Sequence, residues 1–327
     1  LMEHAMICTP ISYQSKTSAQ TFSNFLKHTR TENQLSQEDL CCLLREKSCL
    51  FDALDAITIS RWERGVNIPS LAKQAEIVEI FGSELFDIYR QDKSFVSEGL
   101  ASINLFDSSV ERSEHPYYRN KPYRVEFIDN HHDNFLTLLQ LSLVYESNPR
   151  LCLNNCQLSQ PFFLGLSLVV AFSFGEQIVG HCLFCRTHAK VALEFMNDEV
   201  DLFEVISHNS ESSPDTLMVF SSFGVTPHIE NYMMSVYLNE MALCRSIKYL
   251  SFSICDESLK RKLSQFKLPI FKIRTLENNH RTIKNYSFFA SRTEVMANRN
   301  LLKLSVIPSA KSQTIDPIFF MQLETNI

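Results

Sequence analysis

Glycine is scarce in this chain, whose 327 residues include only seven, where average usage of about 7% would give roughly 23. No two of them lie within four residues of each other, so the patterns G-x-G-x-x-G and G-x-S-x-G are both absent. Gly175 and Gly180 have the spacing of a phosphate-binding loop, but His181 follows where that loop needs lysine. Rossmann-type dinucleotide binding, P-loop NTPase activity and α/β-hydrolase catalysis are therefore disfavoured.

Long apolar runs and an excess of basic residues are also missing. The most apolar stretches, 164–174 and 178–184, are separated by polar residues and stay below the ~20 apolar residues of a membrane helix, so we expect no membrane association. The chain carries 31 Lys and Arg against 37 Asp and Glu, a formal net charge of −6. This balance does not indicate a general polyanion binder, although a local basic face can still exist.

The cysteine content is high, with ten in the chain, which in a small secreted domain would indicate disulfides. This chain is long, and Glu3 and His4 interrupt any apolar signal segment at its start. We therefore expect reduced thiols and a cytoplasmic protein. Cys182 and Cys185 form a C-x-x-C pair, but on a strand they should point to opposite faces, and we expect no metal site.

Residues 22–91 place apolar residues at helical spacing. Ser36 with Asp39 is typical of a capping box at a helix start, Asp55 is a second capping residue, and Gly65 stands where a helix should stop. The pattern predicts five helices, over about residues 22–33, 36–47, 55–64, 70–81 and 84–89.

Three blocks in this region, LSQEDL at 35–40, TISRWERG at 58–65 and PSL at 69–71, resemble the helix-turn-helix domain of the Cro/C1-type (XRE) regulators. The resemblance implies an all-α, five-helix DNA-binding domain over residues 22–91. Leu40 to Trp62 spans 22 residues, where the family usually has about 14. The additional residues, around 48–54, lengthen the turn before the recognition helix.

The resemblance also implies which side chains meet DNA. Arg61 is the best candidate reader of a base, because a guanidinium can bond guanine O6 and N7 at once. The region counts eight basic against eleven acidic residues, so DNA binding would depend on a local patch and on a dimer that reads two half-sites. That patch would comprise Lys27, Arg30, Arg45, Lys47, Arg61 and Arg64. The candidate DNA-binding residues are Ser36, Gln37, Ala56, Ile57, Thr58, Ser60, Arg61 and Arg64.

The chain is expected to divide into four segments. Residues 1–21 form a polar lead that we expect to be disordered, and residues 22–91 the helical domain. Residues 92–121 lose periodicity and collect serine and charge, which is typical of a linker. Residues 122–327 form the second domain.

The second domain shows a mixed pattern in which a hairpin precedes alternating strands and helices, so the chain as a whole is of the α+β class, with a mixed, mostly antiparallel sheet. The predicted strands are 124–128, 166–174, 177–186, 216–225, 249–254, 270–276, 286–290 and 301–306, and the predicted helices are 132–145, 229–244 and 257–266.

Phe174–Gly180 and the turn Phe223–Pro227 before a long helix are similar to the GNAT acetyltransferase fold over about residues 122–276. That family continues with R/Q-x-x-G-x-G/A, whose backbone N–H groups wrap the CoA pyrophosphate. Here Glu230–Ser235 opens with an acid and contains no glycine, so the backbone cannot approach phosphates closely. The family's late tyrosine falls near Leu263. The resemblance thus implies a GNAT-like domain with degenerate chemistry, no catalytic residue and no bound cofactor.

A cleft beside the end of the strand 216–225 could still hold a small-molecule effector. The ligand-pocket candidates are Phe223, Gly224, Val225, Asn231 and Tyr232.

Together these patterns predict a cytoplasmic transcriptional regulator that reads double-stranded operator DNA as a homodimer, with a non-catalytic GNAT-like domain for effector sensing or dimerisation. Two alternatives stay open. One is an active acyl-CoA-dependent N-acetyltransferase fused to a DNA-binding domain. The other is an antitoxin or phage-type repressor whose second domain binds a protein.

Overall fold

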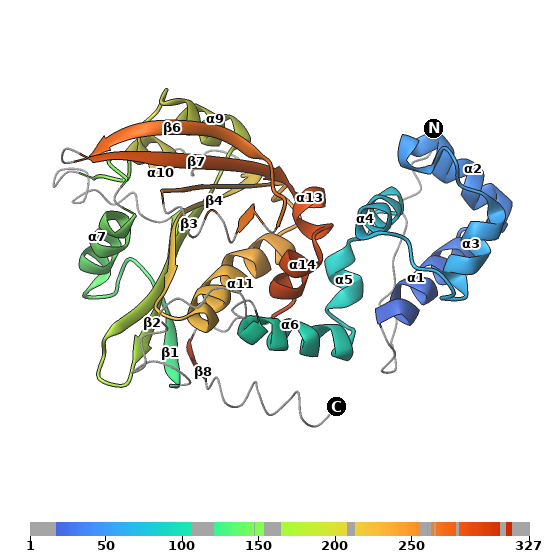
Figure 1. The fold of residues 1–327 in the computed structure, drawn as a ribbon, viewed down its shortest axis with the longest axis horizontal. Helices are drawn as coiled ribbons and strands as arrows, with labels where there is room; N and C mark the ends of the chain where they lie inside the picture. Colours follow the sequence, from blue (N-terminus) through green and yellow to red (C-terminus); the bar gives the residue numbers. More distant parts are fainter. Residues whose placement is uncertain are drawn as a thin grey trace.

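The structure is a computed structural model. It describes residues 18–105, 121–146, 148–153, 165–207, 213–255, 260, 263–264, 266–278, 281–307 and 312–315. Most of the predicted lead, the later part of the predicted linker and most of the predicted helix 257–266 lie outside these residues. Figure 1 shows two units side by side, a helical unit and a larger unit built on one sheet.

The helical unit packs its helices around a small apolar core in which Leu26 and Ile59 are fully buried. The predicted capping box is present, because Ser36 and Asp39 bond each other's backbone N–H groups, and Asp55 Oδ1 accepts from Thr58 N at 2.6 Å. The first helix begins at residue 18, earlier than predicted. The elements are α1 (Ser18–Glu32), α2 (Gln37–Lys47), η1 (Cys49–Phe51), α3 (Ala56–Glu63), α4 (Leu71–Ile80) and α5 (Leu85–Tyr89).

The additional residues before α3 are part of this core. They form the 3-10 helix η1, in which Phe51 is fully buried, and Leu54 is buried behind it. The Leu54 carbonyl accepts a bond from Cys41 Sγ at 3.2 Å. The segment 48–54 is therefore packed against α2 rather than extending into solvent.

The predicted linker is in part a helix. Residues 93–105 form α6 (Lys93–Leu105), and Asp92 Oδ1 accepts bonds from the N–H groups of Ser94 and Phe95 at its start. Phe95 is buried, and its ring packs against Tyr89 with centroids 4.5 Å apart and an angle of 34° between the rings. The sequence pattern missed α6 because only one face of this serine-rich segment is apolar. The helix packs on α11 (Pro227–Leu243) and α14 (Arg299–Ser305), which lie far away in the sequence.

The second unit is built on one sheet, in which the eight strands of the described residues run in the order β6-β7-β5-β4-β3-β2-β1-β8. Neighbours β4 and β5 are parallel, and the other described pairs are antiparallel. This confirms the mixed, mostly antiparallel sheet predicted from the sequence. The strands are β1 (Tyr123–Ile128), β2 (Leu166–Ser173), β3 (Ile178–Thr187), β4 (Thr216–Gly224), β5 (Tyr249–Ile254), β6 (Ile270–Asn278), β7 (Arg281–Ser291) and β8 (Ser312–Ile315).

Helices cover both faces of the sheet, so that strand residues alternate between two apolar clusters. Cys182 belongs to the cluster under α11, and Cys185 belongs to the cluster under α7, α9 and α10. They point to opposite faces, as predicted. The helices are α7 (Phe135–Tyr145), α9 (Ala189–Asn197), α10 (Leu202–Ser207) and α11 (Pro227–Leu243).

The predicted strand 301–306 is wrong, because these residues belong to helix α14 (Arg299–Ser305). Asn298 caps it by accepting bonds from Asn300 N and Leu301 N, and Leu301, Leu302 and Leu304 are all buried. The apolar run resembles a strand in sequence, but the cap starts a helix. The sequence patterns also missed α9, α10, α13 (Arg292–Met296) and β8.

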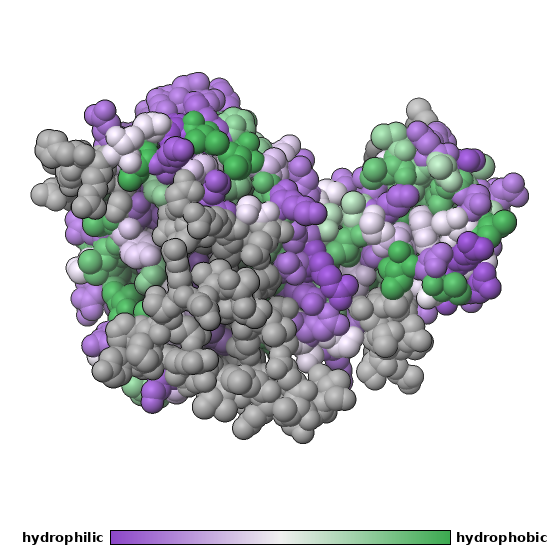
Figure 2. Space-filling view, in the orientation of Figure 1, coloured by the Kyte–Doolittle hydropathy of each residue, from purple (hydrophilic) through white to green (hydrophobic). Residues whose placement is uncertain are grey.

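The two units meet where α4 and α5 face α13 and the end of α11. The Arg292 side chain lies at the centre, donating to the carbonyls of Ala242 (2.8 Å), Cys244 and Ile247 (both 3.1 Å) and bonding Glu84 at the start of α5. Figure 2 shows a hollow between the units, with hydrophilic residues on the side of the larger unit. The cavity there has a volume of about 530 Å³. This joint fixes the helical unit against the sheet unit.

Across the described residues, no helix combines the length and the apolar character needed to cross a membrane.

Candidate functional site

The central strands β4 and β5 separate partway along their length. They pair from Thr216 opposite Tyr249 to Val219 opposite Phe252, and β4 then continues to Gly224 without β5 beside it. Parallel strands that diverge leave a crevice at their carboxyl ends, which is where ligands bind in many open sheets.

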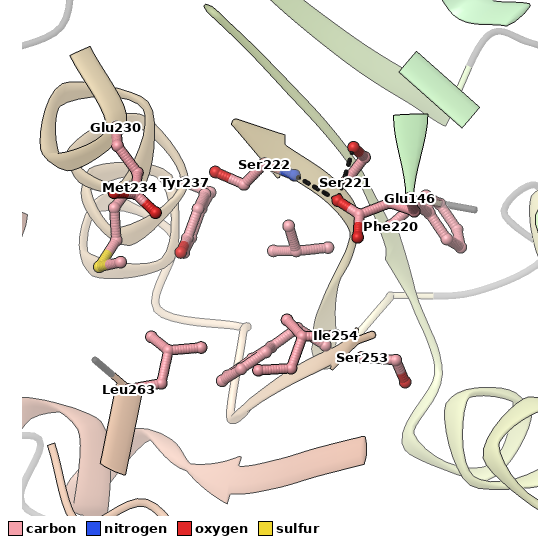
Figure 3. A pocket seen from close by; sticks show the side chains of 12 residues that line it. Glu146, Phe220, Ser221, Ser222, Glu230, Met234, Tyr237, Ser253, Ile254 and Leu263 are labelled. Carbon is pink, nitrogen blue, oxygen red and sulfur yellow. Dashed lines mark hydrogen bonds between the residues drawn. The ribbon is translucent and has the colours of Figure 1, made fainter. Parts of the chain in front are cut away.

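A cavity opens in this crevice, and we call it the wedge cavity. Its volume is about 30 Å³, and the space becomes about 400 Å³ when the opening to solvent is included. Figure 3 shows α11 on one side, the end of β4 on the other and β5 below. Most of the lining is apolar, with two carboxylates and three serines, and none of the lining residues described is Lys or Arg. The lining residues are Glu146, Val219, Phe220, Ser221, Ser222, Glu230, Met234, Tyr237, Phe252, Ser253, Ile254 and Leu263.

A β-bulge in β4 determines which side chains face Glu146. Leu183 pairs with Ser221 and Phe184 with Val219, so Phe220 is an additional residue in β4. Phe220 packs in the cluster under α7, and in a regular strand Ser221 would point to the opposite face. The bulge instead directs Ser221 to the α7 side, a re-aiming that bulges near functional sites often provide.

A chain of hydrogen bonds runs from the sheet into the wedge cavity. His181 Nε2 lies 2.7 Å from Ser221 Oγ, and Ser221 Oγ donates to Glu146 Oε1 at 2.9 Å. Ser222 N–H also donates to Glu146 Oε1, at 3.4 Å (Figure 3). Burial lowers the pKa of His181 to about 4, so its imidazole is neutral near pH 7. The carboxylate of Glu146 is thus held at the cavity by two donors.

On the opposite side, α11 supplies Tyr237 and Glu230. Tyr237 is buried, and this burial raises the pKa of its hydroxyl, so it is a proton-bearing donor at neutral pH. Leu263, near the position where the resemblance places a tyrosine, does line the wedge cavity. The tyrosine hydroxyl in the wedge cavity is thus that of Tyr237 from α11, and not one at position 263.

The first turn of α11 has few backbone donors to offer a phosphate. Val225 N–H donates to Val179 O at 2.8 Å, Ile229 N–H to Thr226 Oγ1 at 3.3 Å and Glu230 N–H to Thr226 O at 2.9 Å. Pro227 has no N–H, and the Glu230 side chain lines the cavity. A pyrophosphate would meet engaged amides and a carboxylate, so the residues present do not fit CoA's pyrophosphate.

The five predicted ligand-pocket residues lie beside the wedge cavity but are not among its lining residues. Phe223 packs on Tyr145 with ring centroids 4.3 Å apart, Val225 bonds β3, and Asn231 and Tyr232 are buried. A Cβ on Gly224 would lie 2.1 Å from Glu230 N. The glycine at this position therefore allows α11 to pack closely on β4.

Sequence reasoning missed Glu146, Ser221 and Tyr237. Glu146 follows α7 and lies 75 residues before Ser221, and no local pattern marks a bulge. The pair of serines at the point where a predicted strand approaches its end was the one available signal.

The candidate DNA-binding residues lie on or beside α2 and α3. Ile57 is 62% exposed, and Arg61 and Arg64 are exposed with it. Ala56, Thr58 and Ser60 are half-buried, and Ser36 is exposed as the cap of α2. The structure brings these side chains together around one short helix.

A buried ion pair fixes α3 against α1 and α2. Arg30 Nε donates to Glu63 Oε1 at 2.5 Å and Arg30 Nη1 to Leu35 O at 2.8 Å. Gln37 Nε2 donates to Glu63 Oε2 at 2.8 Å. Arg30 is 14% exposed in its side chain, so it does not belong to the surface patch predicted from the charge count, and Gln37 is engaged within the unit.

Among the described residues, no group of three His, Cys, Asp or Glu side chains is placed to hold a metal ion.

No family model matches this chain, and no curated protein does. Solved structures similar to it include a probable acetyltransferase from Staphylococcus epidermidis, at 10% identity over 52% of this chain and 99% of that chain, TM-score 0.32. Arabidopsis thaliana NAA60 in complex with acetyl-CoA is 8% identical over 52% of this chain and 98% of that chain, TM-score 0.37. The N-acyl amino acid synthase FeeM from uncultured soil microbes is 11% identical over 54% and 95%, TM-score 0.36.

Proposed function

We propose that the sheet unit is an N-acyltransferase-type domain that transfers an acyl group from a thioester to an amine in the wedge cavity. The observation that carries the proposal is the carboxylate of Glu146, held by Ser221 and Ser222 at the point where β4 leaves β5. The sequence suggested a sensor role because Glu230–Ser235 lacks the glycines of the acyl-CoA motif and the late tyrosine is unmatched. The carboxylate at the wedge cavity supports the alternative of an active transferase.

The reaction needs a proton acceptor. As the amine nitrogen bonds to the thioester carbon, the carbon–sulfur bond breaks, the thiolate leaves and the nitrogen loses a proton to Glu146. A positioned carboxylate of this kind contributes about 10²- to 10⁴-fold to a rate. Tyr237, across the cavity, can donate a hydrogen bond to the leaving sulfur.

The donor is expected to bind through its acyl-thioester end. The amides in the first turn of α11 are engaged, and Glu230 would repel phosphates. Acetyl-CoA and acetyl-pantetheine should therefore support transfer at rates within about tenfold of each other, because the phosphates add little binding.

Glu146→Gln is expected to reduce acyl transfer about a hundredfold, because the amide cannot accept the proton while filling the same space. The full chain is incubated with acetyl-pantetheine and a mixture of primary amines, and N-acetyl products are measured by mass spectrometry, which avoids interference from the protein's own thiols. Glu240→Gln is the matched control, since Glu240 pairs with Arg186 outside the cavity. Equal rates for Glu146→Gln and the parent chain would contradict the proposal.

A second function is proposed for the helical unit, namely sequence-specific binding of double-stranded DNA by α3. It is favoured by the exposure of Ile57, Arg61 and Arg64 on a helix that a buried ion pair holds from behind. Together, the two proposed functions describe an acyltransferase that its helical unit targets to DNA.

Arg61→Ala is expected to weaken binding to a duplex selected from a random pool by about ten- to a hundredfold, with relaxed preference at one base pair, because a bidentate contact to guanine is worth about 1–3 kcal/mol. Fluorescence anisotropy at fixed salt measures the affinity. Lys190→Ala removes an exposed charge on α9, far from α3 (Figure 1), and should change little. If Arg61→Ala keeps both affinity and base preference, α3 does not read DNA.

A further inference from the structure

The hydrogen-bond chain behind Glu146 has a direction that its chemistry fixes. Ser221 has one hydroxyl proton and lies between Glu146 Oε1 at 2.9 Å and His181 Nε2 at 2.7 Å. An ionised carboxylate only accepts, so the serine proton goes to Glu146. His181 Nε2 must then carry the proton that it donates to Ser221 Oγ.

The surroundings of His181 favour this arrangement. His181 is 4% exposed in the middle of β3, and the Tyr145 ring meets it edge-on with centroids 5.3 Å apart. A buried imidazole without a charge partner stays neutral, so it has one donor and one acceptor nitrogen. With Nε2 as the donor, the ring serves Ser221 and cannot take its proton, which makes Ser221 a poor nucleophile and a good hydrogen-bond donor.

We infer that His181 and Ser221 are positioning residues, which act as a one-way donor chain to keep Glu146 ionised and aimed into the wedge cavity. This inference deepens the proposed acyl transfer and rests on it for its role in catalysis, whereas the direction of the chain does not depend on activity. The bulge at Phe220 is the backbone feature that makes the chain possible, since it turns Ser221 to the face of His181 and Glu146.

The chain predicts how the Glu146 carboxyl responds to the loss of a donor. A hydrogen bond to the charged form lowers the pKa of a carboxyl, so removing the serine hydroxyl raises it. The other titratable groups around this carboxylate are unchanged by that substitution. Among the residues that the structure describes, they include His181 from β3, Glu230 and Tyr237 from α11, and Cys255 after β5, and Tyr145 of α7 lies against His181.

The first measurement is made on the full chain with ¹⁵N-labelled histidine, with His181 assigned by His181→Gln. We expect a neutral ring protonated at Nε2 at pH 7. A ring protonated at Nδ1 would show that Ser221 donates to the histidine instead, and this result overturns the inference.

The second measurement is the titration of Glu146 in ¹³C-glutamate-labelled protein. Ser221→Ala should raise the pKa of this carboxyl by about one unit, and Ser221→Thr, which keeps a hydroxyl, should restore it. Ser142→Ala is the matched control, because Ser142 is as deeply buried as Ser221, at 3% exposure each, but bonds Leu138 O within α7. An unchanged titration in Ser221→Ala overturns the inference.

The third measurement links the chain to catalysis. In Ser221→Ala the acidic limb of the pH profile of kcat/KM for acetyl-pantetheine should move to higher pH, and kcat should fall about ten- to a hundredfold with KM unchanged. If the parent chain transfers no acyl group, the proposed function fails, while the tautomer and the titration still decide the inference. A fall in kcat without a shifted limb would show a merely structural role and overturn it.

Discussion

Replacing Arg292 by methionine is expected to lower the free energy of unfolding by about 3 to 5 kcal/mol. Its guanidinium bonds the carbonyls of Met241, Ala242, Cys244 and Ile247 at the end of α11, and it pairs with Glu84 across the joint. Methionine keeps much of the apolar stem but leaves these acceptors and a mostly buried carboxylate without their donor. Arg292 and Glu84 are 14% and 21% exposed in their side chains, so water cannot fully replace the lost bonds.

The measurement is urea unfolding followed by two signals. The fluorescence of the sole tryptophan, Trp62, reports on the helical unit, and far-ultraviolet circular dichroism reports on the whole chain. Because Arg292 touches both units, both transitions should move to lower urea concentration. Arg299→Met is the matched control, since that side chain is 54% exposed and its partner Glu98 is 42% exposed, an ion pair of about 1 kcal/mol at most. Arg299 also lies over the Phe95 ring at 5.8 Å, so a small additional loss is expected. Equal midpoints for the two variants would show that the Arg292 joint contributes little.

Gly224→Ala is expected to lower the free energy of unfolding by about 3 kcal/mol, at the upper end for an overpacked core. The added Cβ would lie 2.1 Å from Glu230 N, 2.6 Å from Glu230 Cα and 2.7 Å from Ile229 C. These are backbone atoms of α11, so no side-chain rotation can relieve the contact, and the helix must move away from β4. Since α11 forms one wall of the wedge cavity, the variant should also lose acyl transfer.

Ser222→Ala is the control for this variant in the unfolding measurement, because it lies two residues earlier in β4 and adds no atom. The free energy of unfolding of Ser222→Ala should stay within about 0.5 kcal/mol of that of the parent chain. A change below about 1 kcal/mol for Gly224→Ala would mean that α11 is free to shift, and that the close approach at Gly224 is not what sets the shape of the cavity.

The sequence was most informative where structure is decided locally. Ser36 with Asp39 and Asp55 with Thr58 are caps whose partners lie three residues away, and the hairpin at Gly175 follows from a glycine with φ of 101°. The helix α14 was mistaken for a strand because its apolar run looks the same in either state until Asn298 is recognised as a cap.

The candidate site could not be predicted in the same way. Its chain joins residues from β3, β4 and the end of α7, separated by 40 and 75 positions in the sequence. The bulge that aligns them depends on how β4 pairs with β3, which no short segment encodes. The sequence did show that glycine is missing at the start of α11, where the backbone would have to approach a phosphate. In the structure, backbone N–H groups there are already hydrogen-bonded within the protein.

Helix α6 and strand β1 both depend on the far end of the chain. Glu98 of α6 pairs with Arg299 and Lys303 of α14, and β1 is flanked by β8. During synthesis these early elements leave the ribosome about 190 residues before their partners. The nascent sheet would then present β1 as an uncovered edge. Such distant pairing slows folding, and β1 lacks its β8 neighbour until residues 312–315 have emerged.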